Sequence, residues 1–511
     1  KQHMKALLTI NMLWLVYAFF MLLFQAELPL NPDGNPNMTP DLSFNTAISF
    51  LVNCNLQHYS GESSLTYLTQ LPVITFLQFV SAATGIAALI VVFKALSEKS
   101  GEKLGNFFHI LVLSCTRLLI PLCIVIATIL AFNGTPTSFD GKDNIVTLQG
   151  DSLQVSRGPA AGMIAIKHLG TNGGGWFGVN SAHPLENPNY ITYITEMVAQ
   201  VIIPIALVFA LGFYLKRRRL SLVIYTVMTI GFLVFLIPTI MAEINGNPVI
   251  AQMGITQTNG AMEGKEVRFG PVASAYWSIV TTIISTGSVN AMHDSTMPVS
   301  GLMQLLAMMT NAFYGGCGVG ILNYLVYLII AVFISGLMVG RTPEFLGRKI
   351  EAREMKIATL IALLHPFLIL VGTAISSYTI VNYQEADWAV KPANWLNNPG
   401  FHGFSEMLYE NTSAAANNGS GFEGLGDNNI FWNVLTGFIL ILGRYLPIIG
   451  PVAIAGIIAR KKYIPESAGT LRTDTSTFGM MTYFVIIIIA ALAFFPALVL
   501  GPLAEYFTLY K

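Results

Sequence analysis

Residues 166–187 read IKHLGTNGGGWFGVNSAHPLEN, and the interpretation of the whole chain starts from this stretch. Its centre, GTNGGG at 170–175, carries almost no side-chain bulk. Glycines in series lose much conformational entropy on folding, so such a run needs a reason. A phosphate-binding loop does not explain the run well, because no G-x-x-x-x-G-K-[ST] motif is present. In a membrane, irregular backbone is tolerated where protein buries it or where it lines a wet cavity, so the segment is either an ion pathway with carbonyl ligands or a plain outer loop.

The composition is that of a membrane protein. Of the 511 residues, 53% are hydrophobic and only 11% are charged, whereas soluble domains carry about 25% charged residues. Several apolar runs, such as 7–24, 220–240 and 483–500, reach the roughly 18 residues that cross a bilayer. The 4 cysteines show no C-x-x-C spacing, which argues against a disulfide framework or a zinc site.

Positive charges gather in short stretches beside the apolar runs, at 94–103, 216–219, 341–356 and 460–472. The positive-inside rule predicts that these stretches are cytoplasmic, and that the long loops rich in Asn, Gly and Pro lie outside. Basic clusters this close to membrane spans, without an aromatic platform, do not indicate nucleic-acid binding.

One unit repeats along the chain: an apolar span, an outer loop, a short half-apolar segment, a small polar stretch and a second span. We expect such repeats at residues 1–100, 101–219, 220–350 and 351–462, followed by an extra C-terminal transmembrane helix within 463–511. The short segments are too short to span, so they predict re-entrant helices whose carbonyl ends point at a central cavity. The predicted fold is therefore an all-α integral membrane protein with four span–pore-helix–span repeats around one pore.

The small polar stretches supply the candidate ion ligands. Three of them end in glycine after two small polar residues, and the first has Asn at that position, a residue that tolerates left-handed backbone. A turn there would aim successive carbonyl oxygens at the pore. The predicted ion-binding residues of this selectivity filter are Asn53, Cys54, Asn55, Thr171, Asn172, Gly173, Ser285, Thr286, Gly287, Asn417, Asn418 and Gly419.

Three further features lie in or beside the spans. The third return span is interrupted by Gly315, Gly316, Gly318 and Gly320. This density predicts an unwound hinge that gates the filter, and a close helix-packing face is the alternative. Arg444 lies in the middle of the fourth return span and is predicted to face the pore, because a charge at that depth is costly. Lys167 could either face the pore or extend to the outer surface.

Several motifs together resemble a known family. NSAHPLENP at 180–188, MHDS at 292–295, GRTPE at 340–344 and GPLAEY at 501–506, with LGTNGGG at 169–175, are similar to the potassium-binding A subunit of Kdp-type potassium-transporting ATPases. The resemblance implies that the filter residues bind K⁺ and that a separate P-type ATPase chain, the catalytic B subunit, hydrolyses ATP. It also implies smaller C and F subunits, and a bacterial inner (plasma) membrane. The family usually has one more span before the first repeat, so an N-terminal span is expected to be missing here.

The sequence contains no Walker A motif and no D-K-T-G phosphorylation sequence. We therefore expect this chain to bind no nucleotide and not to be an enzyme by itself. Two alternatives to a pump subunit stay open: a stand-alone potassium channel or Na⁺- or H⁺-coupled potassium symporter of the same superfamily, and a membrane enzyme using His183 or His293. The expected surroundings of the spans are membrane lipid, and no nucleic-acid partner is expected.

Overall fold

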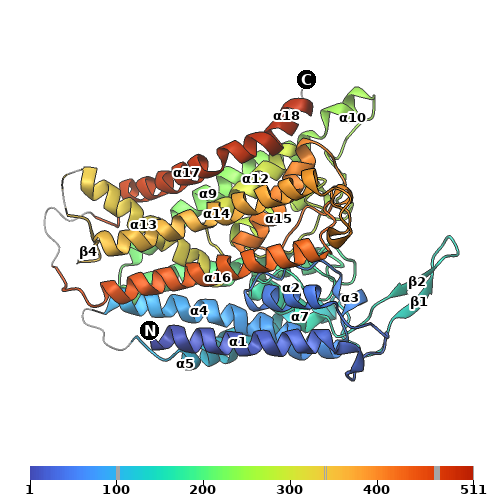
Figure 1. Ribbon diagram of the computed structural model, residues 1–511, viewed down its shortest axis with the longest axis horizontal. Helices are drawn as coiled ribbons and strands as arrows, with labels where there is room; N and C mark the ends of the chain where they lie inside the picture. The colour runs from blue at the N-terminus through green and yellow to red at the C-terminus, as the bar shows by residue number, and fades with distance from the viewer. Residues whose placement is uncertain (99–103, 339, 341, 465–471, 510–511) are drawn as a thin grey trace.

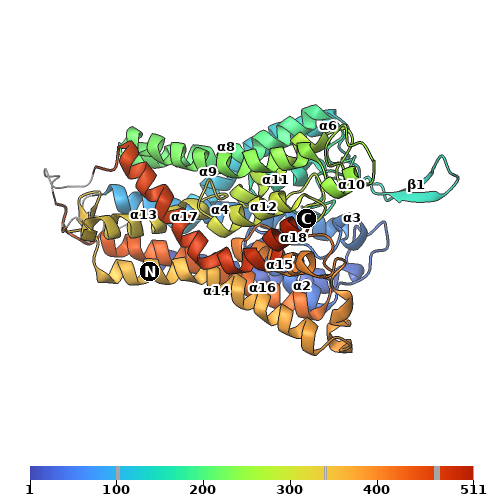
Figure 2. The same ribbon diagram turned by 90° about the horizontal axis from the view of Figure 1, so that it is seen from above.

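The computed structural model describes residues 1–98, 104–338, 340, 342–464 and 472–509. Long helices lie roughly side by side along the longest axis of the molecule, and shorter helices are enclosed among them (Figures 1 and 2). Within the described residues, 9 helices are long and apolar enough to cross a membrane. The chain is a multi-pass membrane protein.

The helices follow the predicted order of span, short helix and return span. The first spans are α1 (Gln2–Leu23), the continuous helix Phe107–Phe132 that includes α5 (Phe107–Leu113) and α6 (Ile120–Phe132), α9 (Arg218–Asn245) and α14 (Ala352–Asn382). The short helices are α2 (Pro40–Leu51), α7 (Ala161–Leu169), α11 (Gly270–Ile284) and α15 (Phe401–Ala416). The return spans are the helix Thr69–Ser97 with α4 (Phe76–Ser97), α8 (Tyr190–Tyr214), the pair α12 (Pro298–Thr310) and α13 (Val319–Met338), and α16 (Ile430–Ile458).

This order confirms the predicted fold class. After the fourth return span, α17 (Ser476–Leu498) adds the extra C-terminal span, and α18 (Ala504–Leu509) continues it after a turn. The short helices are enclosed by protein rather than lipid. In α15, Glu406, Glu410 and Asn411 are each at most 1% exposed although the helix is rich in polar residues. Burying polar groups at this depth is tolerated only when they are paired, so the spans around α15 must supply partners.

Two small antiparallel sheets complete the structure. Strands β1 (Asp143–Val146) and β2 (Ser152–Val155) form a hairpin with Asp143 opposite Val155. This hairpin projects well beyond the helical body (Figures 1 and 2). Strands β3 (Glu344–Phe345) and β4 (Arg348–Lys349) pair at the other end of the molecule.

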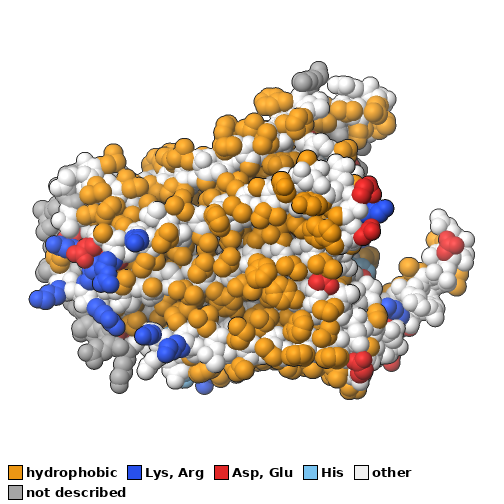
Figure 3. All heavy atoms as spheres, in the orientation of Figure 1, with side chains coloured by type: hydrophobic (Ala, Val, Ile, Leu, Met, Phe, Trp, Pro, Cys, Tyr) orange, Lys and Arg blue, Asp and Glu red, His pale blue; other side chains and the backbone are white. Residues whose placement is uncertain are grey.

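The surface is banded along the long axis. Hydrophobic side chains cover the middle, Lys and Arg gather at the end that carries β4, and acidic side chains gather at the opposite end (Figure 3). We call these the basic end and the loop end. An apolar band with polar ends is the surface expected of a helical bundle in a bilayer.

Candidate ion-binding site

The four small polar stretches have one backbone conformation in common. The first residue of each has a left-handed φ: 63° at Asn53, 51° at Thr171, 59° at Ser285 and 51° at Asn417. The third residue also has positive φ: 58° at Asn55, 93° at Gly173, 94° at Gly287 and 104° at Gly419. All twelve residues of the four stretches are buried. Positive φ is rare for residues other than glycine. Its occurrence at the first and third residue of all four stretches therefore indicates that the four loops must adopt the same backbone geometry.

Each stretch is tied to its own short helix through backbone N–H groups. The middle residue donates to the carbonyl oxygen five positions earlier: Cys54 to Ser49 (3.1 Å), Asn172 to Lys167, Thr286 to Thr281 and Asn418 to Ser413 (each 2.9 Å). The next N–H is held by a hydroxyl in the last two repeats, since Gly287 donates to Thr281 Oγ1 and Gly419 donates to Ser413 Oγ, both at 2.9 Å. Donors thus face the short helix, which leaves carbonyl oxygens for the other side.

The four stretches contact one another in cyclic order. A Cβ added to the glycine of one stretch would overlap the middle carbonyl oxygen of the next stretch. The pairs are Gly173 with Thr286, Gly287 with Asn418, and Gly419 with Cys54. The ring closes between the first and second repeats, where Asn53 Nδ2 donates to the carbonyl oxygens of Gly170 and Thr171, both at 3.0 Å. In three of the four stretches the third residue is glycine, and the next loop's middle carbonyl lies against it.

The interrupted third return span lies directly beside this ring. Helix α12 ends at Thr310 and α13 begins at Val319, and Gly316 and Gly318 between them have φ of 61° and 106°. The N–H of Cys317 donates to Thr171 Oγ1 at 3.0 Å. The segment is therefore unwound and also closely packed, so the two interpretations of these glycines are not exclusive.

Arg444 lies where the fourth return span meets this break. Its side chain is 6% exposed, and Nη2 donates to the carbonyl oxygen of Ser81 at 3.2 Å. A Cβ added to Gly85 would lie 3.1 Å from Arg444 Nη2, and the same atom would overlap the carbonyl oxygen of Cys317. The guanidinium thus bridges α4 and α16 next to the break. A small cavity of about 20 Å³ lies nearby, and its lining includes Asn311, Asn323, His365, Ala415 and Gly443.

Lys167 neither faces the ring nor extends to the surface. Its Nζ lies 2.7 Å from Glu186 Oε1 and 3.2 Å from the carbonyl oxygen of Gly178, and both charged side chains are fully buried. Lys167 occupies the helix position of the hydroxyl residues Thr281 and Ser413. Its ammonium ties the segment after the glycine run to α7.

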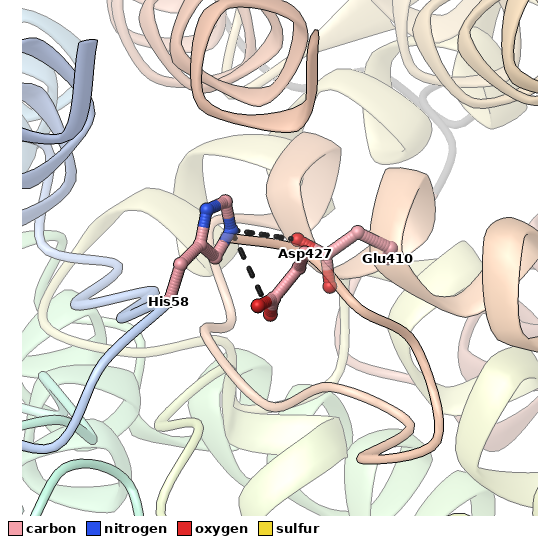
Figure 4. A group of neighbouring side chains, drawn as sticks. All are labelled: His58, Glu410 and Asp427. Atoms are coloured by element: carbon pink, nitrogen blue, oxygen red, sulfur yellow. Dashed lines mark hydrogen bonds and ion pairs between the residues drawn. The ribbon is translucent and has the colours of Figure 1, made fainter. Parts of the chain in front are cut away.

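A buried ionic cluster on the loop-end side was not predicted. His58 points towards Glu410 and Asp427, at 3.2 and 3.9 Å from Nε2 (Figure 4). Its Nδ1 lies 2.6 Å from Asn433 Oδ1, while Asn433 Nδ2 donates to Asp41 Oδ2. Both ring nitrogens face acceptors, so His58 is an imidazolium. Burial alone would lower the pKa of His58, but Asp427 and Glu410 outweigh it and raise that pKa to about 9. These residues are far apart in sequence and carry no motif, so no local signal could have found them.

Four re-entrant helices whose loops close into a buried ring, enclosed by membrane spans, define a pore-loop ion transport protein. The potassium-transporting ATPase A subunit family matches residues 1–507, and the chain belongs to that family.

Similar proteins include the potassium-transporting ATPase potassium-binding subunits of Flavobacterium johnsoniae, 69% identical, and Geobacillus kaustophilus, 47% identical. In both comparisons the match covers 100% of this chain and 89% of the relative. Among solved structures, the potassium transporter TrkH from Vibrio parahaemolyticus has a similar fold, with a TM-score of 0.56 and 14% sequence identity over 88% of this chain and 84% of that one.

Proposed function

We propose that this chain binds K⁺ in the ring made by residues 53–55, 171–173, 285–287 and 417–419, and translocates it as the channel-like subunit of an ATP-driven uptake pump. K⁺ must exchange its hydration shell for oxygens of similar number and field strength, which neutral carbonyls from four loops can supply. The observation that carries the proposal is the cyclic packing of Gly173, Gly287 and Gly419 against the next loop's carbonyl. Each of the proposed repeats (1–100, 101–219, 220–350 and 351–462) contributes one quarter of this ring.

Below the ring, the break at 315–320 and Arg444 form the proposed gate. The hydrogen bond from Cys317 to Thr171 joins the break to the filter, so a movement of one displaces the other. Arg444 places a positive charge beside the break, where it would disfavour a cation resting under the filter. The cavity lined by Asn311 and Asn323 is the proposed exit from the ring.

The pump needs partners. We propose that a P-type ATPase chain, the catalytic B subunit, hydrolyses ATP, that C and F subunits complete the complex, and that the apolar band is covered by lipid of a bacterial inner membrane. This chain would bind no nucleotide. Family membership supports a pump subunit and not a stand-alone channel or symporter. Co-purification followed by a K⁺-stimulated ATPase assay tests this, since a channel or symporter would keep transporting without the ATPase chain.

The ring is tested by adding a side chain inside it. In Gly173→Ser or Gly287→Ser, the new Cβ meets a carbonyl of the next repeat and disfavours the positive φ. We expect weaker K⁺ affinity and partial loss of discrimination against Rb⁺ and Na⁺, because one quarter of the carbonyl ring is displaced. The measurement is ATPase activity of the assembled complex across concentrations of the three ions.

The control is a glycine with free space around it. Gly141, in the loop before β1, is less suitable, because a Cβ there would lie 3.0 Å from Asp33 Oδ1 and 3.4 Å from Pro32 Cβ. Gly162 in α7 is better: it is exposed, belongs to the same repeat as Gly173, and has nothing within 4 Å of the Cβ position. Gly162→Ser should keep wild-type affinity and ion preference. If the ring variants match it, these loops do not hold the ion.

The orientation of the bundle is tested by labelling. We propose that the basic end is cytoplasmic and the loop end is outside, as the charge distribution in Figure 3 suggests. Cysteines introduced at Asn144 in β1 and at Arg219 at the start of α9 are both at exposed positions. A membrane-impermeant thiol reagent applied from outside should label the first and not the second. The reverse pattern would invert the proposed direction of transport.

A further inference from the structure

Two sequence motifs that the pore does not use meet at the loop end of the molecule. Asp294 belongs to MHDS (292–295) and Glu505 belongs to GPLAEY (501–506), and His402 at the start of α15 lies between them. His402 Nε2 is 2.9 Å from Asp294 Oδ1, and Nδ1 is 2.8 Å from Glu505 Oε1. Carboxylate oxygens only accept here, so both ring nitrogens donate and His402 is an imidazolium. It holds α18 and the loop after the third filter stretch against α15.

A third carboxylate reaches the same point from inside. Glu406 is 0% exposed, and its Oε1 accepts from the backbone N–H and Nδ2 of Asn398 at 3.2 and 3.0 Å. The same Nδ2 lies 3.2 Å from Asp294 Oδ2. Glu406 Oε2 has no hydrogen-bond partner among the described residues. One polar atom from each of Asp294, His402 and Glu406 lies within 4.8 Å of the other two, so the three side chains form a compact group.

The backbone beside these carboxylates leaves room for them. A Cβ on Gly424 would lie 2.5 Å from Glu406 Oε1 and 2.8 Å from Asp294 Oδ2. Glycine at this position thus lets two carboxylates approach the same stretch of main chain.

The charges of this group do not balance. Asp294, Glu406 and Glu505 contribute three carboxylates, and Glu423 adds a fourth, since its Oε2 accepts from the N–H of Asp294 at 3.1 Å. His402 is the cation that the structure places among them. Two other buried carboxylates each have their own cation: Glu186 pairs with Lys167 at 2.7 Å, and Glu243 pairs with Lys265 at 2.9 Å. Buried charge without a partner is costly, so the group at Asp294 must either take up protons or gain added positive charge.

We propose that Asp294 and Glu406 bind a divalent cation of the Ca²⁺ type at the loop end. Carboxylate oxygens are the ligands that such a cation prefers, and Ca²⁺ accepts irregular geometry completed by water. His402 stays an imidazolium strap and does not coordinate. The side chains of Asp294 and Glu505 are 10% and 22% exposed, so the site can be reached from solution. The cation would clamp the third repeat's outer loop to α15, whose other end continues into the filter residue Asn417.

The test is cation binding and thermal unfolding of the full chain, purified in detergent at constant K⁺ and stripped with EDTA. Adding CaCl₂ should raise the unfolding midpoint saturably, with half-saturation on the order of 10⁻⁴–10⁻³ M, and more strongly than MgCl₂. Equilibrium dialysis with radioactive Ca²⁺ should show binding over the same range. Glu406→Gln and Asp294→Asn should remove both responses. Glu385→Gln, at a carboxylate that is 77% exposed beside Lys391, should keep them.

Gly424→Ala provides an independent variant that keeps all four carboxylates. Its methyl group intrudes between Glu406 and Asp294, so Ca²⁺ binding should fall even if the charge variants do not fold. The proposal is overturned if wild-type protein shows no saturable Ca²⁺ binding, or if Glu406→Gln or Gly424→Ala binds as wild type does. The proposal is also overturned if lowering the pH from 8 to 6 stabilises the protein while Ca²⁺ has no effect. In that case Asp294 and Glu406 share a proton instead of binding a cation.

Discussion

The return spans of the third and fourth repeats hold equivalent places in the fold, but their backbone conformations differ: the fourth is a continuous helix and the third is broken in the middle. Helix α16 runs unbroken from Ile430 to Ile458 although it contains Pro447 and Pro451. The third return span leaves the helical conformation between α12 and α13, where the positive φ values include 40° at Asn311 and 106° at Gly318. A proline removes one helical hydrogen bond and can be accommodated among neighbouring helices. Several residues in left-handed backbone cannot be accommodated in a helix at all.

The break is stabilised by other repeats. Cys317 donates its N–H to Thr171 and directs Sγ to the carbonyl oxygen of Leu169 at 3.4 Å. Gly320 donates to the carbonyl oxygen of Gly315 at 2.7 Å, which closes the turn. Interrupting a span thus exposes backbone donors that bind the second filter loop. The intact span α16 keeps its backbone N–H groups within the helix. It contributes the Arg444 side chain and the carbonyl oxygen of Leu440, which accepts from Asn417 Nδ2 at 3.2 Å.

The largest expected effect comes from the same substitution made in both spans. Gly318→Ala places a Cβ 2.5 Å from the carbonyl oxygen of Gly85 and forces alanine to φ of 106°. We expect a loss of roughly 2–4 kcal/mol in stability, and loss of transport. Gly456→Ala in α16 has nothing within 4 Å of the new Cβ and should be neutral or stabilise by about 0.5–1 kcal/mol. Thermal unfolding and K⁺-stimulated ATPase activity measure both, and similar results for the two variants would erase the distinction between the spans.

A smaller effect is expected at the contact between the spans. Arg444→Met removes the hydrogen bond to Ser81 and the positive charge beside the break. A hydrogen bond to a charged group contributes about 1.5–3 kcal/mol, so transport should fall roughly tenfold or more. Arg444→Lys keeps the charge and should recover part of the activity. Wild-type transport in Arg444→Met would show that this charge has no part in ion passage.

The smallest effect is expected at the prolines of the intact span. Pro451→Ala restores a backbone donor within a helix that is already continuous. We expect a change in stability below about 1 kcal/mol and unchanged K⁺ affinity, measured as for the glycine pair. A loss as large as that of Gly318→Ala would mean that α16 also relies on a local distortion.

Much of the architecture could be predicted from local signals. Apolar length identified the spans, and the predicted apolar run at 220–240 lies within α9 (Arg218–Asn245). The glycines of 315–320 identified the break in α12–α13. Asn55, in the place of a glycine, indicated that the first stretch needs the same backbone, and its φ of 58° agrees with that inference. These features can be read from the sequence because each depends on the length or backbone freedom of one continuous segment.

Interactions between distant segments were not predictable in this way. The partner of Lys167 is Glu186, and His58 pairs with Glu410 and Asp427 from the fourth repeat. Arg444 was predicted to face the pore, whereas its hydrogen bond to Ser81 comes from the packing of α16 on α4 and had no signal in the sequence. No periodicity or motif reports which charges meet.

The sequence by itself determined that this is a membrane-embedded bundle with four interrupted, re-entrant units, because chain length, hydropathy and glycine content act within each segment. Only the tertiary structure decided that Gly173, Gly287 and Gly419 each face a carbonyl of the next repeat, and that Asp294, His402, Glu406 and Glu505 gather at one point. Ring closure and charge pairing depend on how the repeats pack around a common axis. That packing is a property of the whole fold, and no single stretch of residues carries it.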